Sequence, residues 1–211
     1  NNVTTSGTIT ANTGSGTAGA IELHSTDTTL VTEAGAVSAQ ATMQGHGGDI
    51  KVLGNKVGLL DNAQVNASGA NGGGQVLIGG DKTGQNLQIR NAEYIYLGKD
   101  SSVKTDALIN GNGGKLITFA SDTARIYGNL YSRGGSEGGN GGFIETSGLK
   151  GFEILNTPDI TAAAGTGGTW LIDPYDIVIN YENNKIDINE KIFTSIDTAT
   201  LDISNITSAL E

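Results

Sequence analysis

The sequence predicts an all-β protein, a right-handed parallel β-helix with three short strands per coil and one loop that leaves the coil. Glycine is the first observation, since it makes up 33 of 211 residues and recurs in clusters without a three-residue period. Each cluster is followed by a short run of residues, and within this run apolar residues alternate with mostly polar ones. β-Branched residues dominate the apolar positions, and no 3.6-residue period is sustained.

The first strand of each coil follows a glycine anchor. The anchors end at Gly19, Gly48, Gly74, Gly114, Gly142 and Gly168. The second residue after each anchor is apolar, and we expect these residues to form one internal core column: Ile21, Ile50, Val76, Leu116, Ile144 and Trp170. A coil cannot bury its apolar face alone, so stacking of coils must close the core.

Two further runs complete most coils. The second runs read TTLV, VGLL, YIYL, ARIY and FEIL, and the third are centred on Val37, Val65, Val103, Leu130 and Ile160. An antiparallel sandwich also contains many short strands. The equal offsets of the apolar residues across repeats favour stacked coils, with glycine at corners where φ must be positive.

The predicted coils span residues 1–180, and two regions depart from the repeat. The interval between Gly74 and Gly114 is longer than the others, so residues 79–92 are expected to protrude as a loop, a natural contact site on a rigid scaffold. Residues 181–211 contain no glycine and alternate only in part. They are interpreted either as a cap over the rod end or as the start of further coils.

Composition excludes several classes of protein. The net charge is −10 with no basic stripe, which argues against nucleic-acid binding. No run of 18 apolar residues occurs, so no membrane insertion is expected. The absence of Cys excludes a disulfide scaffold and a Cys-based zinc site. Since Asn1 opens directly into a polar stretch, we expect a longer chain or a removed leader.

Three glycine-rich stretches carry a family resemblance. They are Asn110-Gly-Asn-Gly-Gly-Lys-Leu-Ile, Gly138-Gly-Asn-Gly-Gly-Phe-Ile-Glu-Thr-Ser-Gly and Gly168-Thr-Trp-Leu-Ile-Asp-Pro-Tyr-Asp-Ile-Val-Ile. With Ala124-Arg-Ile-Tyr-Gly-Asn and Arg133-Gly-Gly, they resemble the filamentous-haemagglutinin-like exoproteins of two-partner secretion, including the high-molecular-weight adhesin branch. The resemblance is specific over residues 75–180 and looser before them.

The resemblance implies a secreted β-helical rod at the bacterial surface. An outer-membrane transporter would export it through a region not recognised in this chain, and it would attach to a host-cell receptor or glycan. This chain therefore resembles a segment of the shaft of such an exoprotein. Other members of the class acquire haem or deliver toxins. The adhesin branch can be glycosylated, which makes Asn2, Asn66 and Asn205 candidate glycosylation sites.

No cofactor, metal or catalytic residue is predicted. His24 and His46 lack a partner at ligand spacing and are expected on surface turns. Asp173 and Asp176 flank Pro174, which favours a turn over a calcium site.

Two alternative functions are a haem-acquisition or toxin-delivery exoprotein of the same secretion class and a carbohydrate-active β-helix enzyme, a polysaccharide lyase or hydrolase. Such an enzyme would need clustered carboxylates and bases on adjacent coils. Glu145 and Glu153 are candidates, but the coil before them should place Ile117 and Arg125 at the matching positions. The nearby rings of Tyr94, Tyr96, Tyr127 and Tyr131 could form a carbohydrate platform, although packing against a neighbouring coil is the favoured interpretation.

Overall fold

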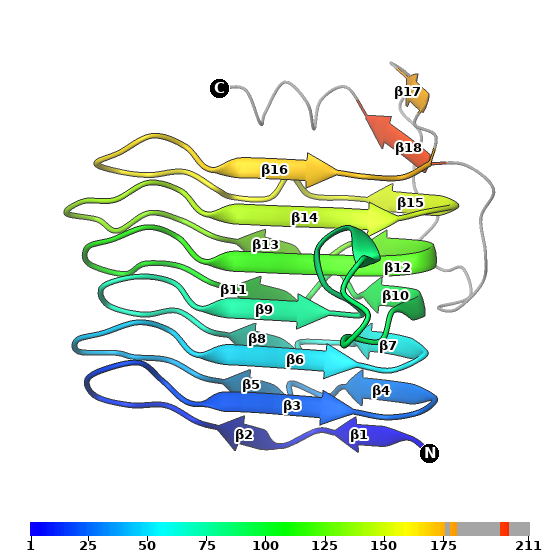
Figure 1. Cartoon of the computed structure of the whole chain (residues 1–211), viewed down its shortest axis with the longest axis horizontal. Helices are drawn as coiled ribbons and strands as arrows, with labels where there is room; N and C mark the ends of the chain where they lie inside the picture. The colour runs from blue at the N-terminus through cyan, green and yellow to red at the C-terminus, as the bar shows by residue number, and fades with distance from the viewer. Residues whose placement is uncertain (176–177, 181–198, 203–211) are drawn as a thin grey trace.

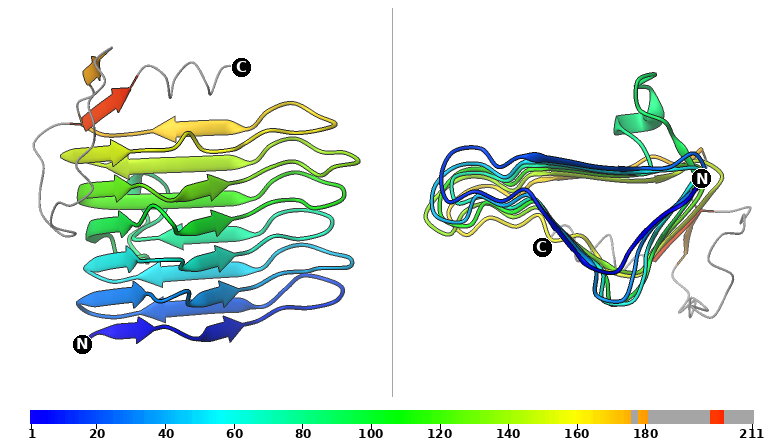
Figure 2. Two further views of the ribbon diagram at one scale, coloured as in Figure 1. Left: turned by 180° about the vertical axis from the view of Figure 1, so that it is seen from behind. Right: turned by 90° about the horizontal axis from the view of Figure 1, so that it is seen from below.

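The computed structural model is a right-handed parallel β-helix of about six turns (Figure 1), as the sequence predicted. It describes residues 1–175, 178–180 and 199–202. Viewed along the rod, the stacked coils superimpose on a three-sided outline with one long, narrow corner (Figure 2). Each strand pairs in parallel with its equivalent on the adjacent coil, so most backbone hydrogen bonds run along the rod axis.

Three faces of strands build the rod. The first face holds β3 (Ala20–His24), β6 (Asp49–Leu53), β9 (Gln75–Ile78), the first half of β12 (Lys115–Ile126), β14 (Phe143–Gly148) and β16 (Thr169–Ile172). The second holds β1 (Val3–Thr5), β4 (Thr28–Val31), β7 (Lys56–Leu59), β10 (Ala92–Leu97), the second half of β12 and β15 (Gly151–Ile154). The third holds β2 (Thr8–Thr10), β5 (Ala36–Ser38), β8 (Gln64–Asn66), β11 (Ser102–Lys104) and β13 (Asn129–Tyr131).

The interior is a continuous apolar core. Along the first face one register position holds Ile21, Ile50, Val76, Leu116, Ile144 and Trp170 as direct partners from coil to coil. The four middle residues of this column are 0% exposed, whereas Ile21 and Trp170 are partly buried and pack against the core. Each coil thus supplies the apolar surface that its neighbour needs.

Close backbone approach explains the glycine anchors. A Cβ on Gly114 would lie 2.0 Å from the carbonyl oxygen of Gly74, and one on Gly142 would lie 2.2 Å from that of Gly114. The sequence-based explanation by positive φ was wrong for these anchors, since positive φ occurs at other glycines of the same corner, such as Gly111 and Gly139. Contact between coils, more than backbone dihedral, selects glycine here.

Three details differ from the simplest repeat. The first and second strands of the fourth full coil merge into the single 12-residue strand β12. The third run of the fifth coil, centred on Ile160, is reduced to one bridge between Tyr131 and Asp159. On the second face, β18 (Ala199–Asp202) lies between β15 and β17 (Val178–Asn180), so a later segment takes the place beside β15. Most of the predicted atypical segment, 181–198 and 203–211, lies outside the described residues.

Candidate contact surface on the outer face

A loop leaves the coil between the end of β9 and the start of β10 and stands outside the rod (Figures 1 and 2). We call residues 79–91 the strap. It contains one short 3-10 helix, η1 (Lys82–Gly84). The sequence placed the excursion at 79–92, whereas Ala92 is fully buried and belongs to β10.

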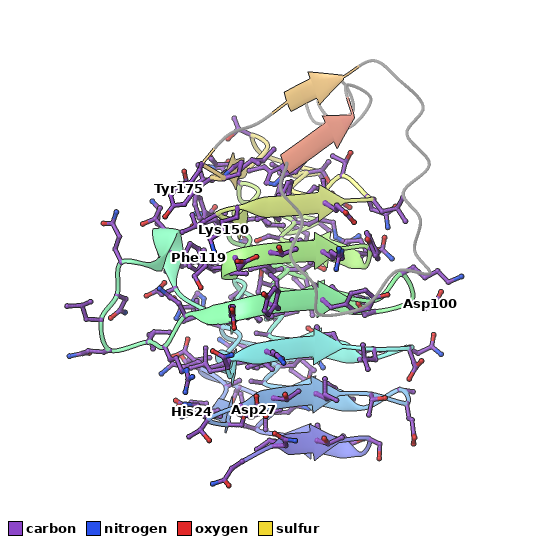
Figure 3. The ribbon with its side chains drawn as sticks, turned by 90° about the vertical axis from the view of Figure 1, so that its right-hand side faces the viewer. His24, Asp27, Asp100, Phe119, Lys150 and Tyr175 are labelled. Carbon is purple, nitrogen blue, oxygen red and sulfur yellow. The ribbon has the colours of Figure 1, made fainter. Side chains whose placement is uncertain are left out.

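The strap covers an apolar cluster that faces away from the core of the rod. Leu77, Ile117 and Phe119 are at most 1% exposed there, and Phe143 and Leu149 pack against them. Figure 3 shows Phe119 at the foot of the strap. The strap lies flat on this cluster because it places glycine over it: a Cβ on Gly84 would lie 2.3 Å from Phe119 Cζ. We call these five residues the outer cluster.

One polar contact fastens the start of the strap to the rod, and another braces the strap internally. Lys115 Nζ lies 2.8 Å from Asp81 Oδ1, and Asn91 Nδ2 donates to the carbonyl oxygen of Gly84 at 2.7 Å. Burial raises the pKa of Asp81, but hydrogen bonds from Asn86, Lys115 and the Lys82 amide outweigh it and lower the pKa to about 2. Asp81 therefore stays ionised over the physiological pH range.

A buried carboxylate lies beneath the middle of the strap. Glu145, on β14, is 0% exposed. Its Oε1 accepts hydrogen bonds from the Thr83 amide at 2.9 Å and from Ser147 Oγ at 3.0 Å. Burial is the largest effect on this group and raises its pKa above the ordinary value, since water no longer stabilises the charge.

The tip of the strap is exposed. Leu87 is 100% exposed, and the neighbouring Asn86, Gln88 and Arg90 are also exposed. The strap thus buries a glycine-rich underside and presents a leucine outward.

The outer cluster was not predicted, although the sequence contains a signal for it. The third residue of each first-face run points away from the core, and it is charged at Glu22, Lys51 and Glu145. At the same register position three coils carry an apolar residue instead, Leu77, Ile117 and Leu171, and the first two lie on successive coils. Two successive outward apolar residues beside a long interval indicate that the excursion folds back over them.

The two glutamates weighed for the alternative enzyme function lie on one coil but on different faces. Glu145 pairs in register with Ile117, and Glu153 with Arg125, as the spacing predicted. Glu145 lies under the strap, whereas Glu153 Oε2 accepts a hydrogen bond from Tyr127 and lies 3.5 Å from Arg125 Nε. Each carboxylate therefore has its own local partners.

The tyrosines divide between two faces. Tyr96 and Tyr127 pack edge to face with ring centroids 5.6 Å apart. Tyr94 follows on the outside of β10, whereas Tyr131 lies on the third face between Lys104 and Arg133, whose cations sit 5.5 and 4.9 Å from its ring. The four rings therefore do not form one platform.

The remaining sequence candidates are dispersed. His24 ends strand β3 beside Glu22 instead of lying on a turn, and His46 lies in the glycine corner opposite Gly72. In the described part of the chain, no group of three or more His, Asp or Glu side chains is arranged to hold a metal ion. Asp176 is outside the described residues, so the pair with Asp173 is not defined.

The candidate glycosylation sites differ in environment. Asn2 is exposed, and its Oδ1 accepts a hydrogen bond from the Thr28 amide. Asn66 is half-buried in β8, with its Oδ1 bonded to the Ser68 amide. Asn205 lies outside the described residues.

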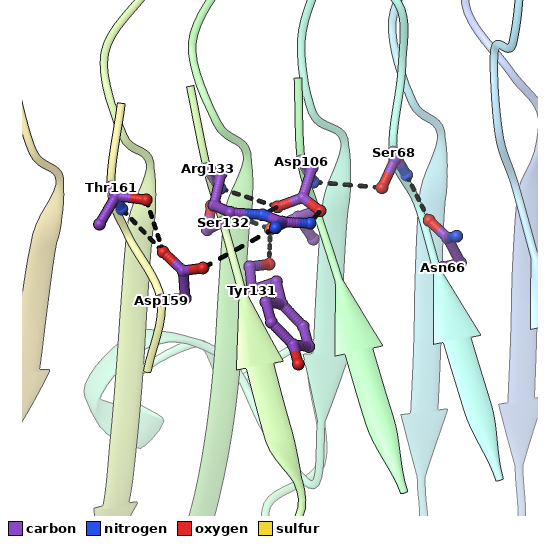
Figure 4. A network of polar contacts seen from close by, with 9 residues as sticks. Asn66, Ser68, Asp106, Tyr131, Ser132, Arg133, Asp159 and Thr161 are labelled. Atoms are coloured by element: carbon purple, nitrogen blue, oxygen red, sulfur yellow. Dashed lines mark hydrogen bonds and ion pairs between the residues drawn. The ribbon is translucent and has the colours of Figure 1, made fainter. Parts of the chain in front are cut away.

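A polar ladder joins the coils where the third face ends (Figure 4). Asp106 is 2% exposed, and Arg133 of the next coil binds it through Nη2 at 2.7 Å and Nε at 3.2 Å. The hydrogen bonds that Arg133 donates to Asp106 raise the pKa of Arg133 above its ordinary value. Asp159, one coil further, lies 3.8 Å from Arg133 Nη1. This ladder holds coils together and offers no open site.

Comparison with known proteins supports the fold. No known family profile matches the chain, and no curated protein matches it. One similar solved structure is the crystal structure of the HMW1 secretion domain from Haemophilus influenzae, with 24% sequence identity and a TM-score of 0.51. The match covers 82% of this chain and 48% of that one, so the chain spans about half the length of that structure. No helix of the described residues is long and apolar enough to cross a membrane. The chain therefore shares its β-helical fold with a bacterial secretion domain.

Proposed function

We propose that this chain is a segment of a secreted bacterial surface exoprotein of the two-partner-secretion type, and that it forms part of an adhesin shaft. The observation that carries the proposal is the fold: a regular rod whose described coils use their buried residues to hold one coil on the next. A rod of stacked coils is long and stiff. A shaft needs both properties to present an attachment site away from a cell surface.

The strap is the part of this segment best suited to attachment. Its exposed tip carries Leu87, with Arg90 close by, on a chain of net charge −10. We infer a contact with a host-cell receptor or glycan, without catalysis. The two carboxylates weighed for catalysis support this proposal, because Glu145 is covered by the strap and Glu153 accepts a hydrogen bond from Tyr127.

A second candidate is the export-recognition part of such an exoprotein. The observation in its favour is the structural likeness to a domain described as a secretion domain. In that case the partner of the chain would be an outer-membrane transporter, and host attachment would belong to other parts of the protein.

One experiment separates the two candidates. The chain is expressed in the periplasm together with a two-partner-secretion outer-membrane transporter, and in parallel the purified chain is tested on host cells and a glycan panel. Export of the isolated chain supports the recognition domain. Retention together with binding that Leu87→Ala weakens supports the shaft. Leu87 is fully exposed, so this substitution should leave stability within about 0.5 kcal/mol of the parent. Retention without any binding would leave a passive shaft and contradict the contact role of the strap.

A further inference from the structure

Glu145 is the only carboxylate in the described residues that both accepts a hydrogen bond from the strap backbone and is completely buried by the closed strap. Its Oε1 has two donors, the Thr83 amide and Ser147 Oγ. Within the described part of the chain, no group donates to its Oε2, which is buried as well. Oε2 is therefore removed from water without gaining a hydrogen bond in exchange. The free-energy cost of this burial falls mainly on the ionised form of the carboxylate.

The surrounding charges come from three elements. Lys82 on the strap lies with its Nζ 5.0 Å above the ring of Phe143 and favours the ionised form of Glu145. Asp173, directly after β16, opposes it. Asp81 and Lys115 also face this region, but they form an ion pair with each other. Burial outweighs the favourable contributions, so the pKa of Glu145 is raised in the closed state.

We propose that closure of the strap is linked to the protonation of Glu145: the strap is held closed most firmly when Glu145 is neutral and opens more often when it is ionised. In the open state water returns to the side chain, and its pKa falls back toward the ordinary value of 4.5. A group with a higher pKa in the closed state binds more protons there, so acid favours closure. As pH rises through the raised pKa, the opening equilibrium constant increases about tenfold for each unit of pKa elevation.

Opening exposes the outer cluster. Leu77, Ile117 and Phe119 are at most 1% exposed while the strap is closed, and the strap residues over Phe119 include Gly80 and Gly84, which carry no side chain. The strap is therefore a pH-dependent cover over an apolar contact surface, more closed in mildly acidic surroundings than at neutral pH. The cover would act in the same way in a shaft and in an export domain.

Hydrogen exchange of the strap amides in the intact chain tests the proposal. Protection of residues 82–85, corrected for the intrinsic exchange rate at each pH, should fall between pH 4.5 and pH 8. In Glu145→Gln, which keeps the oxygen acceptor and is neutral throughout, protection should not vary with pH. In Glu145→Ala, which leaves the Thr83 amide unpaired, protection should be low at every pH.

Asp81→Asn is the matched control. It removes the charge that Lys115 binds, but Asp81 has a pKa of about 2 and does not titrate in this range. Protection should drop at all pH values while the dependence on pH remains. Protection that is flat in the parent chain, an equal slope in Glu145→Gln, or loss of the slope in Asp81→Asn would each overturn the proposal.

Discussion

Gly114 illustrates how one missing methyl group keeps two coils together. The nearest atom to a Cβ added at this position would be the carbonyl oxygen of Gly74 at 2.0 Å, and this atom belongs to the backbone of the adjacent coil. A flexible side chain could move aside, but a strand that pairs along the whole rod cannot. Gly114→Ala should therefore destabilise the chain by about 1–3 kcal/mol or more, the usual cost of overpacking. Urea unfolding measures this as a lower midpoint.

Gly167→Ala is the control in the same corner. Its nearest neighbour, the carbonyl oxygen of Ile160, lies 3.9 Å from the added Cβ, so the methyl group fits. We expect a change within about 0.5 kcal/mol. Equal effects of the two substitutions would contradict close coil-to-coil approach as the reason for the anchors.

At the scale of the element, alternation predicted the strands well because one face of each is buried in a common core. The second residue of each first-face run points inward regardless of what covers the outside, so the register from Ile50 to Ile144 follows from the sequence. The strap position followed from the long interval. Its docking did not, because the outward residues Leu77 and Ile117 are explained only by a cover that another segment supplies.

The polar ladder between coils likewise could not be predicted from the sequence. Asp106 and Arg133 occupy equivalent positions two residues beyond β11 and β13, but a single sequence does not show that their side chains meet. Nothing in the alternation requires a buried carboxylate there. Stacking creates the pair, since it brings the two positions side by side on neighbouring coils.

Removal of Arg133 should destabilise the stack. Arg133→Ala leaves Asp106, whose side chain is 3% exposed, without its two guanidinium hydrogen bonds. The expected loss is about 1–3 kcal/mol, because a buried charged acceptor keeps its desolvation cost when its donor is removed. Arg133→Lys should recover only part of this, since an ammonium group cannot bind both oxygens in the same geometry.

Arg90→Ala provides the matched arginine control for chemical denaturation. Arg90 is exposed on the strap, and its guanidinium makes a long contact of 3.4 Å with Asn55, so its loss should change stability by less than about 0.5 kcal/mol. A double-mutant cycle with Asp106→Ala isolates the pair. If the two single substitutions are additive, the ladder does not couple the coils.

At the scale of the whole molecule, a parallel β-helix must protect the strand edges at the ends of its stack. An uncovered edge presents unpaired amide and carbonyl groups that invite another chain to pair. On the second face this role falls to β18, which pairs with β15 through Phe152–Ala199 and Glu153–Thr200. The later segment thus lies where the next coil would stack, which both a cap and the start of further coils would place there.

Truncation tests the cap hypothesis. A chain ending at residue 180 loses β18 and frees the edge of β15, so it should self-associate or lose solubility, as measured by light scattering coupled to size exclusion. A chain ending at residue 202 keeps β18 and both of its pairings, with β15 and with β17, and should behave like the full chain. If the shorter chain stays monomeric and equally stable, the edge of β15 does not need β18 to protect it. Residues 181–211 are then not a cap. If both truncations associate equally, protection comes from residues beyond 202 and not from the strand itself.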